Sequence, residues 1–177
     1  MSRSSLGDNI QGGEILLPVR TGYILLTILA AVLLDLVPLP KWISWVRPDF
    51  IALTLLYWGI FQPRRLGLLP AWLLGLLMDV ADATLFGQHA LAYSALMFAA
   101  IFLHRRIQMF PLPYQMAHVG ALLLAQQAIQ LLVRIADDSE FPGLTYFVSS
   151  LTATVLWPAV MAAFNAPLRR RSGPDDV

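Results

Sequence analysis

Cysteine is absent from this sequence, and charged residues are few. None of the 177 residues is cysteine, and 13% are Asp, Glu, Lys or Arg. The absence of thiols excludes a disulfide, a cysteine nucleophile and a cysteine-ligated metal site. Soluble proteins carry about a quarter charged residues, so the low charge together with 58% hydrophobic residues indicates an integral membrane protein. Apolar runs account for nearly the whole chain, which leaves no room for a soluble catalytic domain.

Motifs of nucleotide-binding and metal-binding sites are also missing. No Walker motif or GxGxxG turn occurs, and the three histidines, His89, His104 and His118, have no partner at HxxxH or HExxH spacing. Asp82 and His89 could form an acid/base pair, but an ordinary contact within a loop is the commoner arrangement. We therefore predict a protein that is not an enzyme and has no catalytic residue, metal, cofactor or nucleic-acid partner.

Six continuous apolar runs predict six transmembrane helices, because the strands of a barrel would alternate apolar and polar residues. The expected spans are residues 19–37, 50–61, 66–80, 88–103, 114–133 and 146–164. They form an all-α transmembrane domain at residues 19–166, between a cytoplasmic tail at residues 1–18 and a basic cytoplasmic tail at residues 167–177. Between the first two spans, Lys41, Trp42 and Trp45 suit a segment that lies at the membrane surface.

The second and third runs, residues 50–61 and 66–80, are each shorter than the roughly 20 residues that cross a bilayer. A single helix through both would place Arg64 and Arg65 near the bilayer centre, at about 2.5 to 3.5 kcal/mol each. We therefore expect two helices that fold back on each other around a tight turn at the membrane surface.

The distribution of basic residues predicts the orientation of the chain. With six spans and a cytoplasmic N-terminus, nine of the twelve basic residues lie on the cytoplasmic side, namely Arg3, Arg20, Arg64, Arg65, Arg105, Arg106, Arg169, Arg170 and Arg171. The opposite side receives Lys41, Arg47 and Arg134 together with most of the acidic residues. The positive-inside rule therefore places both termini in the cytoplasm.

The third run carries a row of small residues that ends in a carboxylate. Gly67, Ala71, Gly75 and Asp79 recur every four residues and so share one face of a helix. Membrane helices associate through close backbone approach and interhelical polar contacts, so we interpret this row as a helix-packing or partner-binding face. We expect the helix near the centre of the bundle. The alternative is that Gly and Ala are simply common in membrane helices.

Two further groups of polar residues are candidates for a site. In the fifth run, His118, Gln126 and Gln130 share one face, and they either line a polar pocket or bond to the Ser- and Thr-rich start of the sixth run. Interhelical bonding is the favoured interpretation. Near the outer ends of the first spans, we expect an ion-pair cluster with a structural role, formed by Asp35, Lys41, Arg47 and Asp49. Asp49 is also a plausible helix N-cap.

Several short motifs, in this order and spacing, resemble the signature of the bacterial rod shape-determining protein MreD family. They are Arg47-Pro48-Asp49-Phe50, Tyr57-Trp58, Pro63-Arg64, Gly67, Gly75-Leu76-Leu77-Met78-Asp79, and Gly87-Gln88-His89-Ala90-Leu91 with Tyr93. The chain departs from the expected pattern at Ala81-Asp82-Ala83, where relatives tend to have Gly or Ser in the turn.

The resemblance implies a non-enzymatic, multi-pass component of the bacterial inner (cytoplasmic) membrane. Such a protein belongs to the elongasome, the complex that directs lateral peptidoglycan synthesis and maintains cell shape. It would bind MreC directly and lie near MreB, RodA and a class B penicillin-binding transpeptidase, among membrane lipids. The family is also similar in architecture to the substrate-binding components of energy-coupling-factor transporters. That likeness suggests an alternative function, the binding of a small vitamin-like ligand. The family has no established catalytic residues to transfer.

Overall fold

The computed structural model describes residues 20–38, 40, 43, 45–137, 141 and 143–168, and these residues form helices and turns without any strand. The α-helices are α1 (Thr21–Leu36), α3 (Phe50–Phe61), α4 (Leu68–Ala81), α5 (Gln88–Met109), α6 (Leu112–Ala136) and α7 (Val148–Asn165), with 3-10 helices η1 (Leu144–Phe147) and η2 (Ala166–Leu168). The all-α prediction is confirmed. The expected tail at residues 1–18, Lys41 and the arginines at 169–171 lie outside the described residues.

The helices fall into two length classes. Three segments, α5, α6 and the stretch from η1 through α7, are long and apolar enough to cross a membrane. The other three, α1, α3 and α4, have 16, 12 and 14 residues. At 1.5 Å per residue, α3 extends about 18 Å, well short of a hydrocarbon core of roughly 30 Å. These apolar helices are those of a membrane protein, with every predicted span present as a helix.

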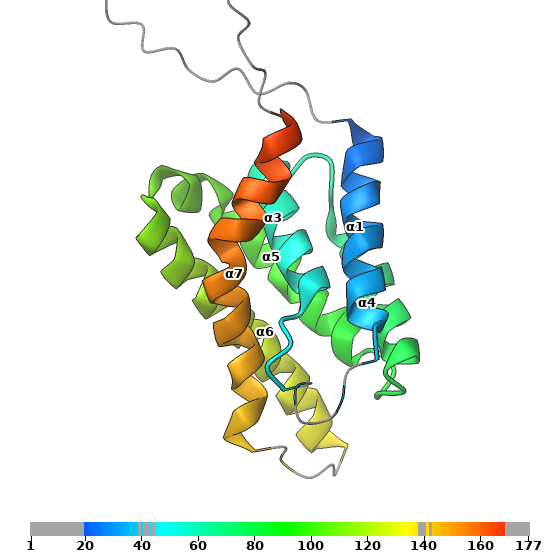
Figure 1. The fold of residues 1–177 in the computed structure, drawn as a ribbon. Helices are drawn as coiled ribbons and strands as arrows, with labels where there is room; N and C mark the ends of the chain where they lie inside the picture. Colours follow the sequence, from blue (N-terminus) through cyan, green and yellow to red (C-terminus); the bar gives the residue numbers. More distant parts are fainter. Residues whose placement is uncertain are drawn as a thin grey trace, which may run out of the picture.

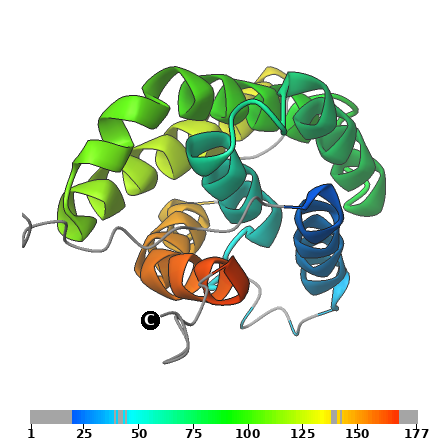
Figure 2. The same cartoon turned by 90° about the horizontal axis from the view of Figure 1, so that it is seen from above.

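The shortest helix, α3, occupies the centre of the bundle. Every residue from 51 to 60 is buried, and α1, α5 and α7 all pack against it, as the view along the helices shows (Figure 2). Its polar atoms are bonded within the bundle: the Tyr57 hydroxyl donates to Asn165 Oδ1 at 2.6 Å, and Trp58 Nε1 donates to Thr27 Oγ1 at 2.9 Å. The expectation that α4 is central is therefore wrong, because α4 exposes Leu69 and other large side chains on its outer face.

Helix α4 packs along α5, and its small residues make this contact possible. Ala71 is fully buried, and a Cβ atom added at Gly75 would lie 2.3 Å from Ala90 Cα. Gly67, by contrast, has open space around it. The chain turns back after α3 as expected, but α5, rather than α3, is the main packing partner of α4. Packing in this region therefore depends on the two backbones of α4 and α5 approaching closely.

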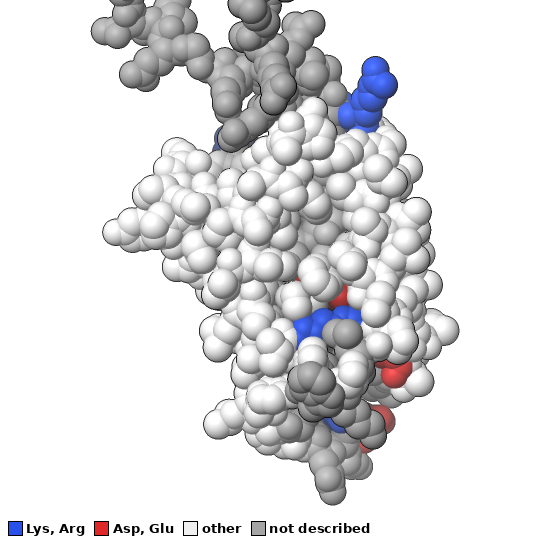
Figure 3. All heavy atoms as spheres, viewed as in Figure 1, with Lys and Arg blue, Asp and Glu red and all other residues white. Residues whose placement is uncertain are grey.

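Successive helices alternate in direction, so the start of α1 and the end of α7 lie at the same end of the bundle (Figure 1). The turn that carries Arg64 and Arg65 and the last part of α5, which carries Arg105 and Arg106, lie at this end. On the face drawn in Figure 3, uncharged side chains cover a broad band between charged residues gathered toward the ends. The end opposite the termini holds the acidic side chains described next.

Candidate functional site

Two carboxylates cap the N-terminus of α3. Asp49 Oδ1 accepts a hydrogen bond from Ala52 N at 2.7 Å. Asp35, at the end of α1, accepts from Ile51 N at 2.9 Å and from Phe50 N at 3.3 Å. The first N–H groups of a helix have no partner within the helix and carry partial positive charge, so carboxylates are favourable there. Both acids therefore stabilise the start of the central helix.

Arg47 binds the C-terminal end of α1, next to these two carboxylates. Its Nη2 lies 3.5 Å from Asp35 Oδ1, and its guanidinium donates to Leu34 O at 2.8 Å and to Val37 O at 2.9 Å. The last carbonyls of a helix favour a cation. The structure thus brings Asp35, Arg47 and Asp49 together, whereas Lys41 lies outside the described residues.

Asp79 caps α5 from the end of α4. Its side chain is 1% exposed, and its oxygens accept from Gly87 N at 2.8 Å and from His89 N at 2.7 Å. His89 Nδ1 lies 2.9 Å from the same carboxylate. Gly87 has a φ of 104°, a left-handed conformation that favours glycine. Asp79 therefore fixes the α4–α5 turn. The spacing of the small residues does not reveal this role, because Gly87 and His89 bind Asp79 through their backbone amides.

Tyr93 and Gln126 connect Asp49 to α5 and α6. The Tyr93 hydroxyl lies 3.0 and 2.9 Å from the two oxygens of Asp49, and Gln126 Nε2 lies 3.4 Å from Oδ2. Tyr93 is buried, so its hydroxyl needs a partner inside the protein. One carboxylate thus joins α3, α5 and α6.

Gln127 makes the main polar contact between α6 and α7. Its Nε2 donates to Ser149 Oγ at 2.6 Å and to Tyr146 O at 3.0 Å, while Ser150 donates to its Oε1. The next turn adds a bond from the Tyr146 hydroxyl to Gln130 Oε1 at 2.8 Å. The glutamine that bonds to the serines is therefore Gln127, which lies outside the row predicted from the sequence.

The structure does not bring His118 together with the two glutamines of its row. His118 Nδ1 lies 2.7 Å from Tyr114 O, and its ring stacks on Phe110 with centroids 4.9 Å apart. Eight residues of α-helix separate it from Gln126, a rise of about 12 Å. The expectation that His118 forms one polar group with Gln126 and Gln130 is therefore wrong.

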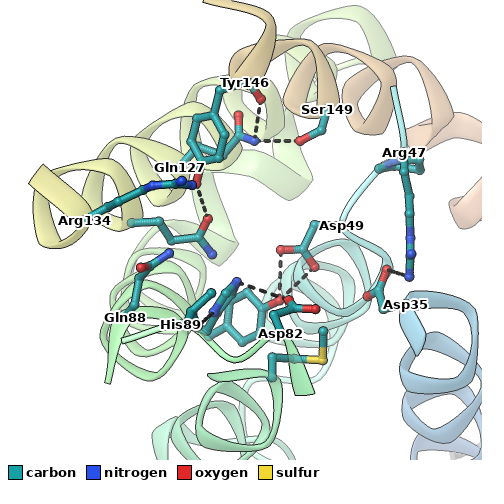
Figure 4. Close-up of a pocket in the computed structure, with 15 residues that line it drawn as sticks. Asp35, Arg47, Asp49, Asp82, Gln88, His89, Gln127, Arg134, Tyr146 and Ser149 are labelled. Atoms are coloured by element: carbon teal, nitrogen blue, oxygen red, sulfur yellow. Dashed lines mark hydrogen bonds and ion pairs between the residues drawn. The ribbon is translucent and has the colours of Figure 1, made fainter. Parts of the chain in front are cut away.

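A cavity of about 280 Å³ lies among these groups at the end of the bundle opposite the described termini (Figure 4). Its polar lining comes from every α-helix or from a turn next to it, and includes Asp35, Arg47, Asp49, Asp82, Thr84, Gln88, His89, Tyr93, Gln127, Gln130, Arg134, Tyr146 and Ser149. Most of these side chains already bond to helix termini or to neighbouring helices. The arrangement can hold the helix ends in register and present a few remaining polar groups to a small ligand.

Comparison with known proteins gives one consistent result. The family described as rod shape-determining protein MreD matches residues 19–166, the range that contains all six described α-helices. A rod shape-determining protein MreD from Haemophilus influenzae is 26% identical over 130 residues, which cover 73% of this chain and 80% of that relative. No solved structure matches the chain significantly. The expected likeness to energy-coupling-factor transporter components therefore stays a prediction.

Proposed function

Because this chain belongs to the rod shape-determining protein MreD family and so takes part in rod shape determination, we propose that it is a non-enzymatic membrane scaffold of the cell-wall elongation complex. The family match over residues 19–166 carries this proposal. The geometry supports it, because Asp35, Asp49 and Asp79 are each engaged by backbone amides at a helix N-terminus. Carboxylates used in this way serve the architecture of the bundle.

MreC is the proposed direct partner, with MreB, RodA and a class B penicillin-binding transpeptidase in the same complex. The bundle offers large apolar surfaces for a partner helix, since α1, α4 and α7 all carry exposed leucine or valine side chains. The row of small residues on α4 serves packing within the bundle in this proposal, because the surface at Gly75 is filled by the backbone of α5.

The proposed location is the bacterial inner membrane with both termini in the cytoplasm. The alternating helices support it, because they place the start of α1, the end of α7, the turn with Arg64 and the end of α5 with Arg105 at one end of the bundle (Figure 1). A reporter fused to the C-terminus should be accessible from the cytoplasm. A reporter accessible only from the periplasm would overturn this orientation.

Co-purification tests the scaffold function. Tagged protein solubilised in mild detergent should retain MreC, whereas an unrelated six-helix membrane protein with the same tag, expressed at the same level, should not. Recovery of a stoichiometric vitamin-like molecule without MreC would instead support the alternative function as a ligand-binding transporter component.

A further inference from the structure

Arg134 and Asp82 place opposite charges at the polar end of the bundle. The guanidinium of Arg134, in the last turn of α6, makes no hydrogen bond or ion pair with the described part of the chain. Asp82, just after α4, has a side chain that is 48% exposed, and its Oδ2 lies 3.9 Å from His89 Nε2. Both residues line the 280 Å³ cavity and an adjoining one of about 370 Å³. They therefore face common space without pairing with each other.

A buried amide adds an unused donor beside Arg134. Gln130 is 5% exposed, and its Oε1 accepts from the Tyr146 hydroxyl. Gln130 lines the same cavity, and its Nε2 is buried with no hydrogen-bond partner among the described residues. Buried donors are nearly always paired, and an unpaired one is unfavourable. The α6 wall thus offers a cation and an amide N–H to an oxygen-rich group.

Asp49, Asp35 and Arg47, which also line the cavity, already have partners within the protein. Asp49 is bound by Ala52 N, Tyr93 and Gln126, while Asp35 and Arg47 pair with each other and with helix ends. In the 280 Å³ cavity the groups left for a ligand are donors on α6 and the Asp82 carboxylate on the α4–α5 turn, and Asp137 adds a carboxylate to the adjoining cavity. Figure 4 shows Arg134, on α6, and Asp82, in the α4–α5 turn, at separate sides of the pocket. A complementary ligand carries both an oxyanion and an ammonium group.

We propose that this cavity binds a phosphoethanolamine group, with its phosphate oxygens at Arg134 and Gln130 and its ammonium at Asp82. The cavity lies below the roughly 300 to 1,000 Å³ typical of ligand sites, which suits a headgroup rather than a larger molecule. Phe86 is 70% exposed in the adjoining turn, and Trp45 is exposed at the same end of the bundle. Aromatic side chains favour the membrane interface. The cavity is therefore at headgroup depth, and a phospholipid is the expected source of the group.

Lipid selectivity of the unaltered full-length protein is the first test. Native mass spectrometry and thermal shift in detergent would compare phosphatidylethanolamine, phosphatidylglycerol and soluble phosphoethanolamine. We expect phosphatidylethanolamine to bind about tenfold more tightly than phosphatidylglycerol, because only the former carries the ammonium. Soluble phosphoethanolamine binding as tightly as the lipid would support the site with a soluble source. Equal affinity for the two lipids together with no binding of soluble phosphoethanolamine would overturn the proposal.

Charge-removing variants locate the site. Arg134→Gln and Asp82→Asn should each weaken phosphatidylethanolamine binding about tenfold, and Asp82→Asn should leave phosphatidylglycerol binding unchanged. Arg105→Gln, at the opposite end of the bundle, is the matched control and should bind as the unaltered protein does. Equal losses in Arg134→Gln and Arg105→Gln would contradict the assignment. Because the chain is tested alone, these results do not depend on the proposed assembly with MreC.

Discussion

Substitution of Gly75 by alanine separates packing from helix propensity, because the two effects have opposite signs. In an exposed helix interior, Gly→Ala stabilises by about 1 kcal/mol. At Gly75, however, the added Cβ would lie 2.3 Å from Ala90 Cα, 2.5 Å from Ala90 N and 2.7 Å from His89 C. These are backbone atoms of α5, which cannot move aside as a flexible side chain can. The helices must separate, and we expect a net destabilisation.

The size of the effect follows from what that separation breaks. Overpacking of a tight interior typically costs about 1 to 3 kcal/mol. Moving α5 outward also stretches the bonds from Gly87 N and His89 N to Asp79, which are 2.8 and 2.7 Å long. Hydrogen bonds to a charged group contribute about 1.5 to 3 kcal/mol. Gly75→Ala should therefore lower the free energy of unfolding by about 3 kcal/mol, and Gly75→Leu by more.

Two other glycines provide matched controls in the same assay, unfolding in mixed detergent micelles. Gly22, in α1, has no atom within 4 Å of an added Cβ, so Gly22→Ala should be neutral or stabilising by up to about 1 kcal/mol. Gly59 would meet Met97 Sδ, near the end of a flexible side chain, and Ala100 Cβ, which moves only with its backbone, both at 2.9 Å, so Gly59→Ala should fall between the two. A Gly75→Ala protein as stable as the Gly22→Ala protein would refute the reasoning.

Five further variants, used in three tests, probe the polar contacts by the same unfolding measurement. Asp79→Asn should lower the free energy of unfolding by about 3 kcal/mol, because the anion that holds the start of α5 is lost. The substitution Asp82→Asn, at an exposed position, should change it by less than about 0.5 kcal/mol. Equal effects would contradict the capping role of Asp79. Gln127→Leu should lower the free energy of unfolding by about 1 to 2 kcal/mol, and Gln126→Leu by about 0.6 kcal/mol. The reverse order would contradict the role of Gln127 in the α6–α7 contact. Tyr93→Phe should cost about 1 kcal/mol, and an unchanged stability would show that its bond to Asp49 contributes nothing.

Continuous apolar runs were enough to predict the helices, but they did not predict which helix is central. Both α3 and α4 are apolar on all sides, so neither has a polar face that would mark its outer surface. The centre is decided by packing, which gives α3 three neighbouring helices. Helix ends were also imprecise, since α5 continues to Met109, past the predicted end at residue 103. Arginine favours helices, and its long side chain can extend from the helix end to the interface.

The polar site could be predicted only where charged side chains partner each other. Asp35 and Arg47 have opposite charges at the ends of neighbouring spans, so the sequence points to their contact. The roles of Asp79 and Gln127 left no comparable signal. Asp79 binds backbone amides, which every residue has, and Gln127 lies one position away from the row that the spacing of four residues selects. Main-chain partners and side-chain direction become visible only once the helices are placed.

The difference in helix length explains how a polar cavity can exist within an apolar bundle. At the end opposite the termini, α6 and α7 extend beyond α1 and α3 (Figure 1). The short helices therefore stop before their neighbours do and leave a recess beyond their ends. In that recess the unpaired N–H groups at the start of α3 and α5 need acceptors, and Asp49 and Asp79 supply them. The cavity and the burial of Asp49 thus have one cause, the short central helix, and lengthening α3 by a turn at its N-terminus should fill the cavity.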